Sequence, residues 1–139
     1  MINFIIPGQP VGKARPRVTK WGTYTPKKSK EYEKKVIACF YDAGGCNLGA
    51  EAIIEIEIKA IFAIPKSTSK KKKVLMLQGA IRPCKKPDFD NIAKCVCDAL
   101  NNHAYEDDKQ IIKAAVEKTY GEEPRVEVTI TQNPSLIKG

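Results

Sequence analysis

The sequence predicts an α+β (mixed α/β) fold, in which helices cover a mixed β-sheet. Three observations lead to this prediction: strict alternation over residues 52–64, helical periodicity from Ser29 to Ala43, and two further alternating segments at 110–120 and 125–131. The expected order is β-α-β-α-α-β-β. A chain of 139 residues suffices for one hydrophobic core, so residues 1–139 are expected to form a single small domain.

The first half of the chain opens with a short expected strand at residues 2–6, which Pro7 and Gly8 end. Residues 12–26 have the composition of a basic loop or irregular ribbon. Ser29 has the residue type of a helix N-cap, and apolar residues recur at helical spacing after it. Gly44 and Gly45 end this pattern, which is typical of an amphipathic helix.

The remaining elements follow from periodicity and turn composition. In residues 52–64 one face is apolar and the other is charged, which predicts a half-buried strand. A short basic helix is expected from Ser67 to Gln78, and a second helix over 90–102. Residues 110–120 and 125–131 flank a turn-like segment, so we expect them to form a terminal hairpin.

Composition excludes several classes of protein. With 42% hydrophobic residues, 29% charged residues and a mean hydropathy of −0.35, the chain has no apolar run near the roughly 18 residues of a membrane span. The N-terminal residues lack the pattern of a secretory signal, so a cytoplasmic location is expected. The 5 cysteines show none of the paired spacings of a zinc ribbon or a disulfide framework, and reduced thiols are the simplest account.

The positive charge is concentrated in one half of the chain. Residues 1–86 hold 18 Lys/Arg against 6 Asp/Glu, whereas residues 87–139 hold 6 against 10. The basic half fits either a surface for a polyanion such as nucleic acid or ordinary solvated lysines. For the run Lys70 to Lys73 the solvated interpretation is favoured. Nucleic-acid contacts are instead predicted for five other basic residues: Lys13, Arg15, Arg17, Lys85 and Lys86.

An acidic stripe accompanies the expected helix at 90–102. At 100° per residue, Ile92, Ala93, Val96, Ala99 and Leu100 fall on one face, which we expect to enter the core. The opposite face carries Asp90, Asn91, Lys94, Asp98 and Asn101. Asp88 lies just before the helix. A purely structural alternative to a functional role is that Asp88 or Asp90 serves as the helix N-cap.

Aspartates without neighbouring cysteine or histidine ligands suit a hard cation such as Mg²⁺, which prefers oxygen ligands and retains several waters. Such a cation beside a basic surface indicates phosphodiester chemistry, because it lowers the pKa of a bound water and neutralises charge at the phosphate. The spacing therefore favours a metal-dependent nuclease or another phosphoryl-handling enzyme. The twelve-residue calcium loop of EF-hands is absent from the sequence.

The acidic segment also resembles a known family. The resemblance to RusA-type Holliday junction resolvases is carried by three runs: Lys86-Pro87-Asp88-Phe89-Asp90-Asn91-Ile92-Ala93-Lys94, then Asp98-Ala99-Leu100-Asn101, then Tyr105-Glu106-Asp107-Asp108-Lys109-Gln110-Ile111. The expected order of elements agrees with that family over the whole chain, while the 86–111 block holds the specific motifs.

The resemblance implies a homodimeric, Mg²⁺-dependent endodeoxyribonuclease that nicks four-way DNA junctions in recombination and repair. It implies catalytic roles for Asp88, Asp90, Lys94 and Asp108, with Asp88, Asp90 and Asp108 as metal ligands. Asp98 and Asp107 match acidic family positions without an assigned role. Lys94 could act on the phosphate, the leaving oxygen or the attacking water. The structural alternative to such a catalytic role is an ion pair with Asp90 one turn earlier.

Two other functions remain open on the residues alone. A non-catalytic nucleic-acid-binding protein would use the acidic cluster as a helix cap and a solvated face. A small-molecule phosphatase would account for a metal site but would leave the basic half without a role.

Overall fold

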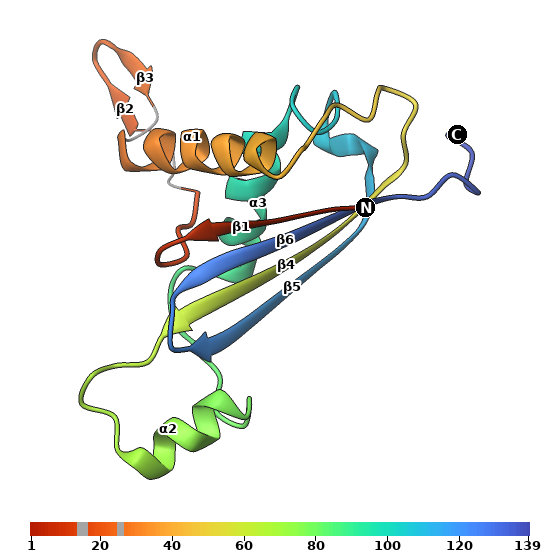
Figure 1. Ribbon diagram of the computed structural model, residues 1–139. Coiled ribbons are helices and arrows are strands. Elements are labelled where there is room, and N and C mark those ends of the chain that lie inside the picture. Colours follow the sequence, from red (N-terminus) through yellow and green to blue (C-terminus); the bar gives the residue numbers. More distant parts are fainter. Residues whose placement is uncertain (14–16, 25–26) are drawn as a thin grey trace.

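The computed structural model describes residues 1–13, 17–24 and 27–139, and its elements agree with an α+β fold. Figure 1 shows the four long strands as one layer, with α1 above it and α3 behind it, while β2 and β3 project separately. The helices are α1 (Lys27–Asp42), α2 (Lys70–Leu77) and α3 (Phe89–Leu100), with a 3₁₀ turn, η1, at Asp108–Gln110. The strands are β1 (Ile2–Pro7), β2 (Arg17–Thr19), β3 (Gly22–Tyr24), β4 (Ile54–Ala63), β5 (Ile111–Gly121) and β6 (Arg125–Gln132).

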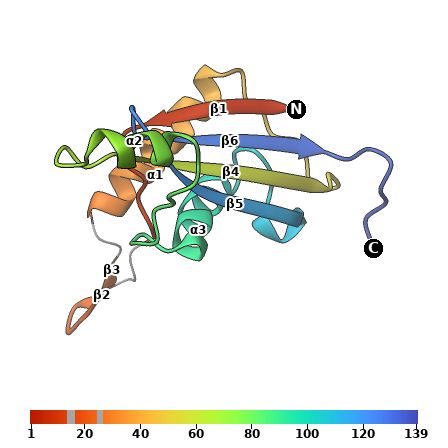
Figure 2. The same ribbon diagram turned by 90° about the horizontal axis from the view of Figure 1, so that it is seen from below.

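Within the described residues, the main sheet has the strand order β1-β6-β4-β5. The pairs β1–β6 and β4–β6 are antiparallel, and β4–β5 is parallel. The sheet is therefore mixed, as expected. Figure 2, seen from below, shows the four strands side by side in this order. The strands β2 and β3 form a separate antiparallel ribbon.

The core lies between one face of this sheet and the helices α1 and α3. The predicted face of β4 is buried at Ile54, Ile56, Ile58, Ala60 and Phe62. Helix α3 buries Ile92, Cys95, Val96, Ala99 and Leu100, which confirms the predicted core face except that Ala93 is only partly buried. Since apolar burial drives folding, this contact fixes which side of α3 faces solvent.

The terminal hairpin prediction is wrong. Strands β5 and β6 are consecutive in the chain, yet β4 lies between them and pairs with both. Two strands flanking a third are about 10 Å apart, a distance that the short connection at residues 122–124 can span. The arrangement places the most apolar strand inside the sheet, where both of its edges are hydrogen-bonded to neighbouring strands. Turn composition alone does not specify which strands pair.

Three other boundaries differ from the sequence predictions. Helix α1 begins at Lys27, so Ser29 lies inside its first turn and is buried rather than acting as the N-cap. Within the expected basic loop, residues 17–24 form the ribbon of β2 and β3. The short basic helix begins later than expected, because Ser69 is its N-cap and accepts a hydrogen bond from the Lys72 N–H at 3.3 Å. In the described part of the chain, no helix has the length and apolarity of a membrane span.

The loop after β1 packs against the start of α3. The backbone N–H of Lys13 donates to the Asn91 carbonyl at 3.0 Å. A Cβ on Gly12 would lie 2.9 Å from the Cβ of Pro87, closer than real Cβ atoms approach, and 3.1 Å from that of Asn91, which is also a tight contact. Glycine is therefore required at this close approach. The contact brings the basic N-terminal segment beside the acidic segment at residues 88–90.

Candidate active site

The segment that carries the predicted aspartates is anchored to the end of the sheet. Arg82 donates to the Glu117 carboxylate at 3.0 Å and to the Lys118 carbonyl at 3.3 Å, both on β5. The ammonium of Lys118 donates in return to the Lys85 carbonyl. The Lys86–Pro87 peptide bond is cis, and Asp88 follows at the start of α3. Residues 82–85 are thus held against β5 at both ends.

Asp88 and Asp90 both face solvent at this helix start. Asp88 occupies the N-cap position, but its side chain makes no capping hydrogen bond. The Asp90 carboxylate accepts one hydrogen bond, from the Asn91 N–H at 3.0 Å. Asp88 thus occupies the N-cap position without the side-chain hydrogen bond of a cap. Both carboxylates have oxygens free to bind a ligand.

Two hollows lie on either side of this segment, and Lys86 and Asp88 line both. One, of about 650 Å³, is bounded by Arg82, Pro83, Cys84, Lys85, Lys86, Asp88, Phe89, Asp90, Val116 and Lys118. The other, of about 630 Å³, is bounded by Pro10, Val11, Gly12, Lys13, Lys28, Ser29, Lys86, Pro87, Asp88 and Asn91. Asp88 therefore lies between the two hollows and Asp90 lines the first, and each hollow has basic side chains in its wall.

Aromatic rings position part of the positive charge. The Lys85 ammonium lies 5.8 Å from the ring centroid of Phe62 and 5.5 Å from that of Tyr120. The Lys118 ammonium lies 5.2 Å from the Phe62 centroid on the same strand ends. Cation–π attraction is weak at exposed sites, at about 0.5–1 kcal/mol, but it favours side-chain positions beside the carboxylates. The sequence reasoning missed Lys118, which reaches this place only because β5 pairs with β4.

Lys13, predicted to contact nucleic acid, has an internal role in the structure. Its ammonium pairs with Glu33 on α1 and lies 3.7 Å from the Asp98 carboxylate on α3. Burial lowers the pKa of Lys13, but the hydrogen bond and charge of Glu33, with the charge of Asp98, raise it by more, so the pKa is above its usual value. This charge joins the two helices, and its contact with nucleic acid stays a prediction.

The other predicted nucleic-acid residues fall in different places. Lys85 and Lys86 are exposed and line the hollows beside the carboxylates. Arg15 lies outside the described residues. Arg17 begins β2, and only its backbone is described. The run Lys70 to Lys73 is exposed on α2, in keeping with the favoured solvated interpretation.

Lys94 is exposed one turn after Asp90. Among the residues that the structure describes, no ion pair joins Lys94 to Asp90. The i,i+4 ion pair, which was the structural alternative for this lysine, is therefore not formed. Its ammonium is available on the same helix face as the Asp90 carboxylate.

Asp108 lies nearer the far end of α3 than the start. It belongs to η1, and the negative charges of Asp107 and Asp98 act on it. Partial burial, a hydrogen bond with Asp107 and these two charges raise the pKa of Asp108. Asp98 is eight residues, or about 12 Å of helix rise, beyond Asp90. The structure thus groups Asp108 with Asp98 and Asp107, and groups Asp88 with Asp90.

Asp107 differs from Asp108 in its local role. The Asp107 carboxylate caps η1, because it accepts a hydrogen bond from the Lys109 N–H at 2.9 Å. That hydrogen bond, together with the interaction with Asp108, lowers the pKa of Asp107. The carboxylate of Asp108 makes no such cap. The catalytic and metal-binding role that the resemblance implies for Asp108 stays a prediction.

Gln110 positions this acidic turn, and the sequence reasoning gave it no role. Its side-chain amide donates to the carbonyls of Gly49 at 2.8 Å and Ala52 at 2.9 Å. Its carbonyl accepts from the N–H groups of Glu106 at 2.9 Å and Asp107 at 3.1 Å. The side chain is buried, so these bonds replace water completely. The sequence did contain a signal for this role, because Gln110 is a polar residue at the first position of the alternating segment 110–120.

In the described part of the chain, no three His, Cys, Asp or Glu side chains are grouped closely enough to hold one metal ion. The ligand set Asp88, Asp90 and Asp108 therefore stays a prediction. The pair at the start of α3 nevertheless has suitable chemistry, because Mg²⁺ is commonly bound by one or two carboxylates together with water and substrate phosphates. The free oxygens of Asp88 and Asp90 fit such a site.

A solvent-facing carboxylate pair beside lysine-lined hollows suits an enzyme that acts on phosphodiesters with a divalent cation. Comparison with known proteins agrees: residues 7–131 match the family model described as Endodeoxyribonuclease RusA. The chain belongs to the RusA endodeoxyribonuclease family. It is also 39% identical over 137 residues, 94% of this chain and 96% of the relative, to the Bacillus subtilis (strain 168) protein named Uncharacterized protein YqaN.

We predict that Gln110→Leu lowers the free energy of unfolding by about 2–4 kcal/mol, because a side chain of similar size replaces four buried hydrogen bonds. Chemical denaturation measures this loss. Gln78→Leu, the same change at an exposed position, should alter stability by less than about 0.5 kcal/mol. Equal effects of the two substitutions would show that Gln110 does not hold the acidic turn.

We predict that Lys13→Met lowers the free energy of unfolding by about 1–2 kcal/mol, because it leaves Glu33 and Asp98 without their shared cation. A double-mutant cycle with Glu33→Gln should give a coupling of about 1 kcal/mol. Since the pKa of Lys13 is raised above 10.5, this contribution should be constant from about pH 7 to 9 and be lost only as pH rises through the folded-state pKa.

The control for this cycle is Lys27→Met, which breaks the exposed Lys27–Glu31 pair at 3.7 Å. Solvent screens that pair, so the change should be below about 0.5 kcal/mol. A coupling near zero between Lys13 and Glu33 would mean that the ammonium does not join α1 to α3 and is free for other contacts.

Proposed function

We propose that this protein is a Mg²⁺-dependent, structure-selective endodeoxyribonuclease that resolves Holliday (four-way) DNA junctions by paired symmetric nicks, in DNA recombination and repair in the cytoplasm. The observation that carries the proposal is the Asp88–Asp90 pair, with free oxygens, in a hollow that Lys85, Lys86 and Lys118 also line. Membership of an endodeoxyribonuclease family supports the reaction class.

The basic side chains account for substrate binding in this proposal. Lys85, Lys86 and Lys118 offer positive charge on one side of the carboxylates, and Lys28 does so on the other. One DNA strand carries a phosphate about every 3.4 Å along the helix axis. Neighbouring phosphates would therefore meet the basic surfaces on both sides while one phosphate faces the carboxylates. Charge on both sides also offsets the repulsion between the carboxylates and the DNA.

Asp88 and Asp90 would hold the cation, with Asp108 as the third predicted ligand. When bound, Mg²⁺ supplies charge neutralisation at the scissile phosphate and activation of the attacking water. Lys94, on the same helix face as Asp90 and without an ion pair in the described residues, would stabilise negative charge that develops on the phosphate or the leaving oxygen.

Paired nicks require two active sites. A four-way junction has two-fold symmetry, so an isologous dimer would present two equivalent sites to strands of the same polarity. We therefore propose that the protein acts as a homodimer, which sedimentation of the DNA-free protein measures.

The proposed reaction is tested on an assembled four-way junction and a linear duplex of matched sequence, each with and without Mg²⁺. We expect paired nicks in the junction only when Mg²⁺ is present, while the duplex stays largely intact. Asp90→Asn should reduce cleavage at least about 100-fold, because it removes a charge that a hard cation needs. Its free energy of unfolding should change by only about 0.3–1 kcal/mol, since Asp90 lies in the first turn of α3.

Glu122→Gln removes the same charge from an exposed turn and should leave cleavage unchanged. Equal cutting of junction and duplex would reduce the assignment to a general nuclease. Tight, salt-sensitive junction binding without Mg²⁺-dependent nicks would support the non-catalytic alternative. Near wild-type cleavage by Asp90→Asn would remove this residue from the site.

We predict that replacing both Lys85 and Lys86 with Ala weakens DNA binding and lowers the slope of log affinity against log salt by about 1.8, because each lost phosphate contact removes about 0.9. Replacing Lys70 and Lys71 with Ala removes the same charge from α2 and should change the slope much less. Binding isotherms in metal-free buffer at several salt concentrations measure both slopes. Identical slopes for the two variants would place the DNA path away from the carboxylates.

A further inference from the structure

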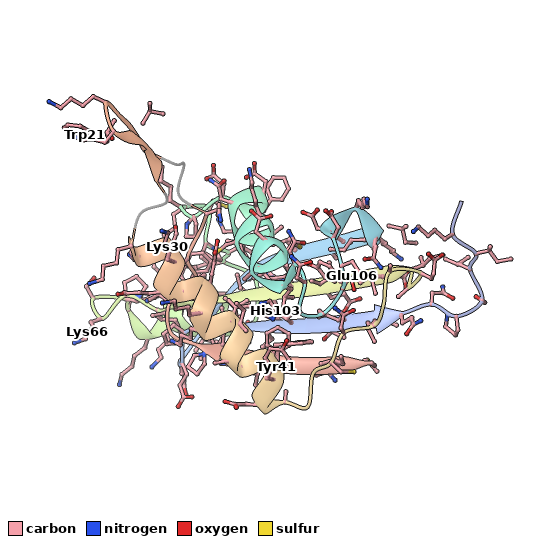
Figure 3. All side chains as sticks on the ribbon, turned by 90° about the horizontal axis from the view of Figure 1, so that it is seen from above. Trp21, Lys30, Tyr41, Lys66, His103 and Glu106 are labelled. Atoms are coloured by element: carbon pink, nitrogen blue, oxygen red, sulfur yellow. The ribbon has the colours of Figure 1, made fainter. Side chains whose placement is uncertain are left out.

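The ribbon of β2 and β3 presents a tryptophan at its tip. The strands pair antiparallel from Arg17↔Tyr24 to Thr19↔Gly22. The Thr19 hydroxyl accepts from the Trp21 N–H at 3.2 Å and donates to the Gly22 carbonyl at 3.0 Å. Gly22 has a φ of 124°, which favours glycine. The turn therefore has a defined backbone, and Figure 3 shows Trp21 at the end of the ribbon farthest from the helices.

Trp21 has no part in the core. Its side chain is 87% exposed, and that of Val18 on the same ribbon is 81% exposed. Tryptophan is normally highly buried on average, and an exposed large apolar side chain at a projecting tip makes little contribution to folding. The chain has a single tryptophan. Its exposed position leaves the indole ring accessible to another molecule.

The charge around the ribbon identifies the kind of molecule. Residues 10–30 contain 7 Lys/Arg and no Asp or Glu. The Lys20 ammonium lies 5.1 Å from the Trp21 ring centroid, and Lys28 lines the hollow next to Asp88. In the described residues Lys13 and Lys27 pair with carboxylates, whereas Lys20 and Lys28 form no ion pair. An aromatic face beside such free positive charge is the arrangement by which proteins stack on nucleobases while holding the phosphate backbone.

We propose that Trp21 stacks on a DNA base at an interruption of the duplex, such as the branch point of a junction, and so contributes to selection of branched over linear DNA. This inference rests on the proposed function, which it deepens by naming a recognition residue. The face of a base is accessible where stacking is interrupted, whereas in a continuous duplex neighbouring base pairs cover both faces. An exposed indole therefore gains more from branched DNA.

The chain length sets how far the recognised base lies from the cleaved phosphate. Lys13 lines the hollow next to Asp88, and Trp21 is eight residues further along the chain. Eight residues span at most about 29 Å, which corresponds to about eight base steps at about 3.4 Å each. The recognised base and the cleaved phosphate thus belong to the same junction rather than to distant parts of the DNA.

The experiment uses the intrinsic fluorescence of the full chain, because all tryptophan emission comes from Trp21. The protein is titrated to saturation with a four-way junction or a matched linear duplex in metal-free buffer, so that no cleavage occurs. We expect the junction to quench the emission strongly and the duplex to quench it weakly. Trp21→Ala should lower junction affinity about 5- to 150-fold, with duplex affinity within about two-fold.

Trp21→Phe, which keeps an aromatic face, should retain part of the junction affinity. The matched control is Val18→Ala, which removes an equally exposed apolar side chain from the same ribbon and should leave both affinities unchanged. Unchanged emission at saturation with the junction, or equal losses for junction and duplex, would overturn the proposal. A spectral shift on concentrating the DNA-free protein, with no further change on adding junction, would also overturn it by assigning Trp21 to contact between copies.

The failure of this proposal and of the proposed function can be distinguished, because stacking is measured without metal. If the junction quenches Trp21 but Mg²⁺ produces no nicks, stacking stands and the resolvase assignment fails. If Mg²⁺ produces paired nicks while the emission stays unchanged, only the role of Trp21 fails.

Discussion

The burial of one face of α3 in the core beneath the sheet is the constraint on which the rest of the site depends. Ile92, Val96 and Leu100 are fully buried beneath the sheet, so α3 cannot rotate without exposing them. That fixed orientation turns Asp90 and Lys94 toward solvent and sets the start of the helix at the end of the sheet. The loop after β1 and the segment 82–88 then pack against this start, which brings basic residues beside the carboxylates.

The same helix separates two acidic groups with different surroundings. At its start, Asp88 and Asp90 face basic hollows and keep free oxygens. Two turns later, Asp98 pairs with Lys13 and also acts on Asp108. Lys13 therefore neutralises charge within the protein, and the net charge of the N-terminal half overstates the number of cations free for DNA. Charge counted along a sequence includes such internal pairs, which only the fold reveals.

The parts of the structure that could be predicted from the sequence are those set by local periodicity. The buried face of α3 and the alternating burial of β4 follow from spacings of 3.6 and 2 residues, and the structure confirms both. Pairing of β5 and β6 was predicted wrongly, because the turn between them is equally compatible with adjacent strands and with strands on either side of β4. Gln110 and Lys118 were missed for the same reason, since their partners are distant in sequence.

Carboxylates and lysines lie close together at the start of α3, and the proposed mechanism needs both kinds of charge. Two carboxylates alone repel a phosphodiester, and lysines alone bind it without chemistry. A divalent cation held by Asp88 and Asp90 would reverse the local sign of charge, so that metal and DNA each favour binding of the other. Lys85 and Lys118 would then hold the DNA strand beside the carboxylates, with one phosphate next to Asp88 and Asp90. Neither component suffices by itself, because the carboxylates need a cation before they can receive a phosphate, and the lysines bind a phosphate without cleaving it.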